Sequence, residues 1–115
     1  MDDVVVIGGG IIGAAAAYFL SKEGRKVKVI ERDPTYKQAS FPLSLGGFRR
    51  QFYQKENILL GKFAREFISQ IPELLKTEKN PNPTASMVPN GYLLMFGPEH
   101  AEEQYRALEN HKACD

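Results

Sequence analysis

The sequence is poor in the residues from which several common kinds of site are built. It has one cysteine, Cys114, in 115 residues, so neither an intrachain disulfide nor a cysteine-based metal site can form within it. Its two histidines, His100 and His111, have no partner cluster and are expected to be solvated surface residues. No Ser-His-Asp, Cys-His or zinc-ligand spacing is present. Hydrolytic and metal chemistry are therefore unsupported, and redox chemistry would need a bound cofactor.

The sequence also lacks a strong charge of either sign and a long uninterrupted apolar run. Its formal net charge is +1. It contains no basic run, so no nucleic-acid partner is predicted. The longest apolar stretch, residues 4–20, contains three glycines at dinucleotide-fingerprint positions and is short for a membrane span, so no transmembrane helix is predicted. Met1 directly precedes the first predicted strand, which leaves no room for a signal or transit peptide. We expect a cytoplasmic location.

Three glycines, Gly8, Gly10 and Gly13, follow the apolar run 4–7 and surround the start of an alanine-rich stretch. Gly8 permits a tight turn out of a strand, Gly10 lets the backbone approach a pyrophosphate, and Gly13 lets a helix pack closely against the strand. The N-terminus of such a helix directs free N–H groups and a positive dipole end at an anion. The spacing therefore predicts a strand, a phosphate-binding turn and a helix.

A second strand and a carboxylate complete this pattern. The helix is predicted over residues 11–23 with Gly24 at its end, and an apolar strand over residues 27–30 is followed by Glu31. A carboxylate there accepts hydrogen bonds from the ribose hydroxyls of an adenosine and repels the 2′-phosphate of NADP, a repulsion that Arg32 weakens only slightly. This order predicts a dinucleotide-binding βαβ unit. The alternative, an ordinary buried turn, has no need of the carboxylate.

The remaining chain alternates loops with regular elements. Residues 35–48 form a predicted loop ending in Gly46-Gly47, which either approaches a ligand closely or is a flexible connection. An apolar stripe over residues 58–75 predicts a core-packed amphipathic helix that Pro72 kinks or ends. Residues 78–86 are polar and form the predicted linker.

Two further elements are predicted after the linker. Asn90-Gly91 is typical of a hairpin turn between short antiparallel strands over residues 85–88 and 92–96. Pro98 and the acidic residues after it begin a helix that runs to about His111.

Three stretches carry a resemblance to a known family. They are Glu31-Arg32, the loop from Gln38 to Arg49, and the run from Asn90 to Leu94. With the glycines, they resemble the N-terminal part of the FAD-dependent oxidoreductase family that includes the D-amino-acid, glycine and sarcosine oxidases. Residues 39–60 most resemble the branch called FAD-dependent oxidoreductase domain-containing proteins and the sarcosine-oxidase β-type subunits. The resemblance covers essentially the whole chain.

The resemblance implies an α/β fold: a Rossmann-like βαβ FAD-binding unit followed by a helix, a β-hairpin and a helix that opens a substrate domain. Residues 1–80 would be the N-terminal part of the FAD-binding domain and residues 81–115 the start of the substrate domain. Both would be incomplete, because in this family the remaining strands and most of the substrate domain come from later sequence. No catalytic residue is predicted in this chain.

The resemblance also implies the cofactor, FAD, and a set of contacts to it. The implied contacts are Gly8, Gly10, Ile12 and Gly13 at the diphosphate, Glu31 and Arg32 at the adenosine, and Ala39, Ser40, Gly46, Gly47 and Arg49 on the path toward the flavin. For Arg49, an exposed and solvated side chain is the alternative.

The family oxidises the C–N bond of an amino acid or an N-methylated amine by passing a hydride to the flavin, and the protein supplies positioning and electrostatics. The implied partner is therefore a small amine or amino-acid substrate, and further subunits stay open. Two alternatives remain. One is an NAD-binding dehydrogenase, which Glu31 allows but the Gly46-Gly47 loop argues against. The other is a non-catalytic assembly protein that keeps a FAD-binding fold.

Overall fold

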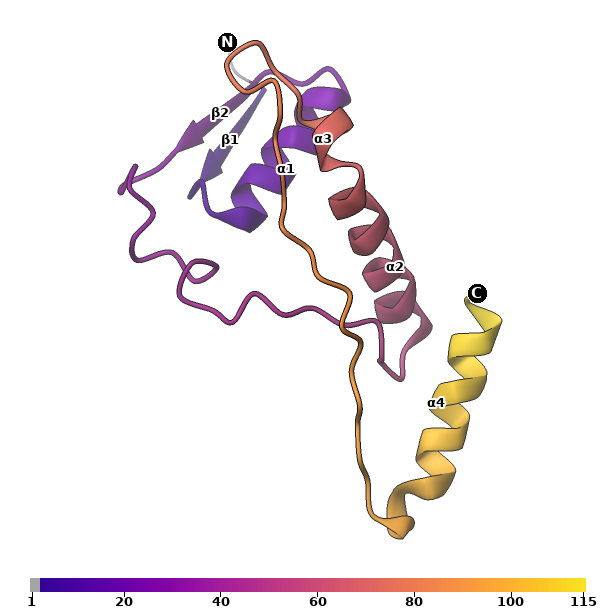
Figure 1. Ribbon diagram of the computed structural model, residues 1–115. Coiled ribbons are helices and arrows are strands. Elements are labelled where there is room, and N and C mark those ends of the chain that lie inside the picture. Colours follow the sequence, from indigo (N-terminus) through magenta and orange to yellow (C-terminus); the bar gives the residue numbers. More distant parts are fainter. Residues whose placement is uncertain (1–2) are drawn as a thin grey trace. The chain divides into compact units, whose positions relative to one another are not determined.

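The computed structural model describes residues 3–115, which belong to two compact units, Met1–Gly47 and Phe48–Asp115. Figure 1 shows a small sheet with one helix in the first unit and helices joined by an extended segment in the second. The functional boundary predicted between residues 80 and 81 is a different kind of division, and it stays a prediction.

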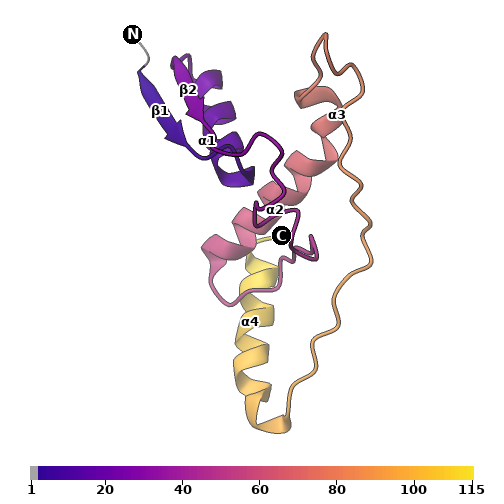
Figure 2. The same ribbon diagram turned by 90° about the vertical axis from the view of Figure 1, so that its left-hand side faces the viewer.

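The first unit contains the predicted βαβ arrangement. Strand β1 (Val4–Ile7), helix α1 (Ile11–Lys22) and strand β2 (Val27–Ile30) follow one another, and β1 pairs with β2 in parallel, from Val4 opposite Val27 to Ile7 opposite Ile30. Figures 1 and 2 both show the two strands side by side with α1 packed against them. Since parallel neighbours need a crossover connection, α1 is the element that permits this pairing.

Helix α1 ends at a left-handed glycine, as the sequence predicts. Gly24 has a φ of 82°, its N–H donates to Ser21 O, and the N–H of Arg25 donates to Leu20 O, each at 3.0 Å. This pair of bonds is the Schellman motif, which satisfies carbonyls that the helix end would otherwise leave without partners. The helix therefore ends at Lys22, one residue before the predicted end.

The loop predicted after the second strand is present and is built from consecutive tight turns. Tyr36 N–H donates to Asp33 O and Ala39 N–H to Tyr36 O, each at 3.0 Å, and Ser44 N–H donates to Phe41 O at 3.1 Å. Tyr36 lies in the left-handed region with a φ of 55°, a conformation that costs a bulky residue about 1–3 kcal/mol. The loop thus has a defined local shape close to the strand ends.

The second unit is helical. It contains α2 (Lys55–Ser69), α3 (Ile71–Leu74), the short 3-10 helix η1 (Pro98–His100) and α4 (Ala101–Ala113). The predicted long helix is divided after Ser69, because Pro72 has no N–H for Ile68 O and its ring crowds that carbonyl. Ile58 of α2 is buried, with 1% of its surface exposed.

The predicted β-hairpin is wrong. Residues 83–97 form neither strand nor helix, although Gly91 does take a positive φ of 75°. Met87 N–H donates to Ala85 O and Asn90 N–H donates to Val88 O, and each of these bonds closes a three-residue turn. Tyr92 O accepts from the Gln51 side chain. An isolated two-stranded hairpin is marginal in water, so the turn signal alone does not pair these segments.

The predicted last helix is present, entered through η1 at Pro98 and continued as α4 to Ala113, two residues beyond His111. Within residues 3–115, no helix has the length and apolar character that crossing a bilayer requires.

Candidate cofactor-binding site

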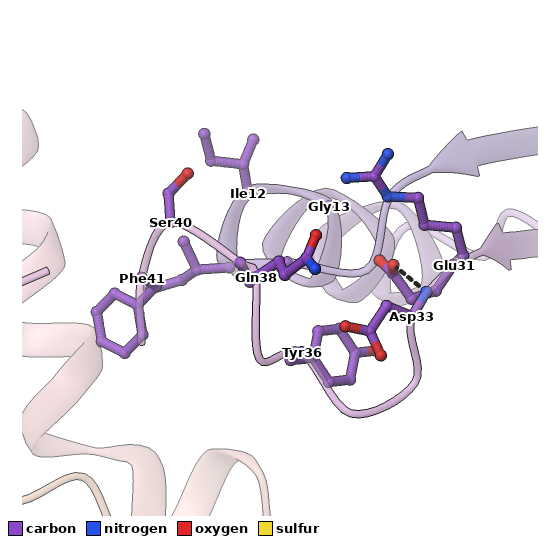
Figure 3. A pocket seen from close by; sticks show the side chains of 12 residues that line it. Ile12, Gly13, Glu31, Asp33, Tyr36, Gln38, Ser40 and Phe41 are labelled. Carbon is purple, nitrogen blue, oxygen red and sulfur yellow. Dashed lines mark hydrogen bonds between the residues drawn. The ribbon is translucent and has the colours of Figure 1, made fainter. Parts of the chain in front are cut away.

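A pocket of about 330 Å³ lies in the first unit, where β1 leads into α1 and β2 leads into the loop. It is lined by residues from the start of α1, by the residues that follow β2, and by the loop: Gly10, Ile11, Ile12, Gly13, Glu31, Arg32, Asp33, Tyr36, Gln38, Ala39, Ser40 and Phe41. Figure 3 shows Glu31 and Asp33 at one end, and Ser40 and Phe41 at the other. The volume is at the lower end of the usual range for ligand sites, about 300–1,000 Å³, which suits part of a dinucleotide.

The Glu31 carboxylate joins the two backbone segments that form one end of the pocket. Its Oε2 accepts from Gly9 N–H at 2.5 Å, and its Oε1 accepts from Asp33 N–H at 2.9 Å; the second bond is the dashed line in Figure 3. A carboxylate offers about four lone-pair positions. With one bond to each oxygen, Glu31 is fixed in place and still able to accept hydroxyl donors.

These two bonds also keep Glu31 ionised. The Asp33 N–H and then the Gly9 N–H hold the pKa of Glu31 below its usual value, because donors stabilise the charged form. The pKa of Asp33 is lowered as well, first by the Thr35 hydroxyl and then by Thr35 N–H. One end of the pocket therefore carries two carboxylates, a charge that disfavours a phosphate on the ribose.

The other electrostatic feature is the open N-terminus of α1. Its first intrahelical bond runs from Ala14 N–H to Gly10 O at 2.8 Å, so the N–H groups of Ile12 and Gly13 have no intrahelical acceptor. No side chain caps this end, and its first turn contains no acidic residue. Free N–H groups and the helix dipole together favour an anion such as a diphosphate.

Gly13 lies where the start of α1 comes very close to the turn after β1. A Cβ on Gly13 would collide with the Gly8 carbonyl oxygen and would lie 3.3 Å from a methyl group of Val6. A Cβ on Gly10 would meet nothing within 4 Å. The structure thus bears out the packing role predicted for Gly13, while Gly10 leaves open space beside the pocket.

Seven of the predicted site residues line this pocket: Gly10, Ile12, Gly13, Glu31, Arg32, Ala39 and Ser40. Gly8 does not line the pocket; it lies in the turn after β1, and its carbonyl oxygen is the atom that Gly13 approaches. Three others are not part of its lining: Gly46 and Gly47, and Arg49, whose guanidinium lies 5.2 Å from the Phe52 ring. The FAD contacts implied for all eleven residues stay predictions.

Five residues of the lining were not predicted from the sequence: Ile11, Asp33, Tyr36, Gln38 and Phe41. Asp33 follows a pattern visible in the sequence, because an aspartate often accepts from the backbone N–H two residues later, in an Asx-turn. Here Thr35 N–H and Thr35 Oγ1 donate to Asp33 Oδ1 at 3.0 and 2.6 Å. Nothing in the sequence indicates the left-handed backbone of Tyr36.

Comparison with known proteins places the chain in a family. The model of the family described as FAD dependent oxidoreductase matches residues 3–114. The FAD-dependent oxidoreductase domain-containing protein 1 of Xenopus laevis is 43% identical over 111 residues, which are 90% of this chain and 22% of that protein. The Bos taurus protein of the same name is 40% identical over 105 residues, 87% of this chain and 22% of that protein.

A homolog from Drosophila melanogaster, named in the same way, is 36% identical over 110 residues, 93% of this chain and 21% of its own length. The chain thus spans about a fifth of the length of these relatives. No solved structure matches it. The resemblance identified from the sequence is confirmed, and the chain belongs to the FAD-dependent oxidoreductase family.

Proposed function

We propose that this pocket binds the ADP part of FAD, and that the protein oxidises the C–N bond of an amino acid or an N-methylated amine. The observation that supports the binding site most directly is the bridge from Gly9 N–H through the Glu31 carboxylate to Asp33 N–H, beside the uncapped start of α1. The pocket thus combines a carboxylate for the ribose with free N–H groups for the diphosphate. These two features match the two ends of an ADP group.

Each group has a separate task. The N–H groups of Ile12 and Gly13 stabilise the diphosphate charge, Glu31 accepts from the ribose hydroxyls, and Ala39 and Ser40 lie along the loop that leads away from the adenosine end. Bound FAD supplies the acceptor for the hydride that leaves the carbon of the C–N bond. The described residues bind and orient the cofactor, and none of them has a predicted role in hydride transfer.

The test is purification of the protein expressed from its complete open reading frame, followed by release and identification of any bound cofactor. FAD is the expected product of release. Bound NAD without flavin would overturn the proposal in favour of a dehydrogenase.

The substrate class is tested by anaerobic mixing of the flavoprotein with D-amino acids, glycine, sarcosine and dimethylglycine. Loss of the oxidised-flavin absorbance with at least one of these is expected. Bound FAD that none of them reduces would overturn the proposed activity and favour the non-catalytic assembly protein.

A further inference from the structure

Tyr36 places its hydroxyl directly over Gly9, the glycine that the carboxylate of Glu31 also approaches. The point where a Cβ on Gly9 would stand is 2.7 Å from Tyr36 Oη and 3.4 Å from Glu31 Oε2. The hydroxyl and the carboxylate therefore both approach the same glycine, at the end of the pocket that the ribose would occupy. Figure 3 shows Tyr36 in the loop just after Asp33, at the same end as Glu31.

The backbone keeps Tyr36 in this place. Its N–H donates to Asp33 O, and its own carbonyl accepts from Ala39 N–H, each at 3.0 Å. The Asp33 carboxylate is in turn held by Thr35. Two successive turns thus hold the left-handed φ of 55°. Strain of this kind persists only where the surrounding structure determines it, and it is concentrated at functional sites.

The two side chains offer complementary hydrogen-bonding chemistry. An ionised carboxylate only accepts, whereas a phenol hydroxyl also donates. A ribose carries neighbouring hydroxyls, each of which must donate once and accept once or twice to be satisfied. Glu31 takes hydroxyl protons, and the oxygens of the same hydroxyls then need a donor, which Glu31 cannot provide.

We propose that Tyr36 is a second recognition residue for the adenosine ribose, and that its hydroxyl donates to a ribose oxygen while Glu31 accepts from the hydroxyls. Position 9, between Gly8 and Gly10, must then be a glycine, because a side chain there would displace the Tyr36 phenol. Tyr36 also fills space that a 2′-phosphate would need. This inference rests on the proposed function, since it assigns a specificity residue within the same site.

The first test measures recognition of the ribose hydroxyls by calorimetry. ADP, 2′-deoxy-ADP and 3′-deoxy-ADP are titrated into flavin-free protein made from the complete open reading frame. Unmodified protein is expected to prefer ADP over at least one deoxy analogue by about tenfold, and Tyr36→Phe to reduce that preference by about threefold or more, as expected for one lost hydrogen bond. Tyr105→Phe, on the exposed surface of α4, is the matched control and should leave it unchanged.

A purely structural Tyr36 would weaken ADP and both deoxy analogues equally, so an unchanged preference in Tyr36→Phe overturns the inference. If the unmodified protein carries no FAD and binds none of the three nucleotides, the proposed function fails first. Bound FAD with an unchanged preference refutes only the role of Tyr36.

The second test asks whether the Tyr36 hydroxyl is what requires a glycine at position 9. Gly9→Ala should lower ADP affinity by about tenfold in the unmodified protein, because the new methyl group meets Oη. In a Tyr36→Phe background it should lower affinity by less than about threefold, since the nearest remaining ring atom is 3.4 Å away. An equal loss in both backgrounds would contradict the proposed placement of the hydroxyl.

Discussion

The two units of the chain are stabilised in different ways. In the first, one side chain, Glu31, accepts from the backbone of two separate segments, and a glycine brings strand and helix into direct contact. In the second, several connections are made by long polar side chains on exposed surfaces: Gln104 to Tyr53 Oη, Asn110 to Tyr53 O, and Arg106 to Glu102.

This difference determines what each unit tolerates. The close contact between Gly13 and Gly8 leaves no room for an added atom. The half-buried carboxylate of Glu31 accepts from two N–H groups, and no other side chain can replace both bonds. Exposed side-chain pairs contribute about 0–1 kcal/mol each. Substitutions in the first unit should therefore change binding steeply, while equivalent substitutions in the second should change it little.

The largest expected effect concerns the first unit without further sequence around it. Expressed as these 115 residues alone, the chain should not retain flavin. The described sheet has two strands and leaves Val5 and Ile7 52% and 88% exposed. A sheet of this size offers too little surface to enclose a dinucleotide. Gel filtration followed by flavin quantification is the measurement. Stoichiometric flavin in the protein peak would show that these 115 residues are a sufficient binding site.

Gly13→Ala should have the next largest effect. The added Cβ collides with the Gly8 carbonyl oxygen, and backbone has nowhere to move, so we expect a loss of about 3 kcal/mol in stability, the upper part of the range for overpacking, and no measurable FAD binding. Thermal unfolding and flavin content of the full-reading-frame protein check this.

The control for Gly13→Ala lies in the second unit. Gly91→Ala adds a Cβ in open space at a φ of 75°, so it should cost about 1 kcal/mol of strain and leave flavin content unchanged. Equal loss of flavin in both variants would break the contrast between the units.

Gly10→Ala should separate binding from stability. Its Cβ meets nothing within 4 Å and its φ is −62°, so thermal unfolding should barely change. A methyl group between the backbone and a diphosphate should remove at least one charged hydrogen bond, a loss of about 30-fold in FAD affinity, measured by fluorescence titration. Unchanged affinity would mean that the diphosphate does not approach this turn.

The parts of the structure that the sequence could predict depend on local signals, in both units. The βαβ unit depends on signals that act within a few residues, such as Gly24 at the helix end, and β1, α1 and β2 lie where predicted. Pro72 and Pro98 likewise act locally and correctly mark a helix break and a helix start.

Prediction failed where the outcome depends on contacts outside the local pattern. Asn90-Gly91 specifies a turn but cannot supply a neighbouring sheet, so the hairpin strands are not formed. The site shows the same limit: the glycines and Glu31 follow from spacing, whereas Tyr36 reaches the pocket only through two turns whose geometry reverses the usual sign of φ.

Glu31→Gln should produce a moderate effect. A glutamine has one carbonyl oxygen, so it can accept from Gly9 N–H or Asp33 N–H on the side of that oxygen, and its NH₂ group then faces the other donor. We expect about a tenfold loss of FAD affinity, within the range for a charged hydrogen bond, and a smaller discrimination against ADP that carries a 2′-phosphate. Glu102→Gln on α4, 82% exposed, is the matched control and should change neither.

The smallest effect is a response to acid that belongs to the first unit. The pKa of Glu31 is lowered from 4.5 by the two N–H donors, so its ionised form is favoured by folding. A group with a lowered folded pKa contributes stability that is complete above its unfolded value and is lost as pH falls through the folded value. FAD binding requires the ionised carboxylate of the folded protein, so FAD affinity should stay flat from about pH 8 to about pH 5 and decline only at pH values below 4.5, where Glu31 of the folded protein takes up a proton. Because Glu31→Gln has no carboxylate to protonate, its affinity should decline less over the acid range, and an identical decline in both proteins would assign the acid response to another group, such as Asp33, whose pKa is also lowered.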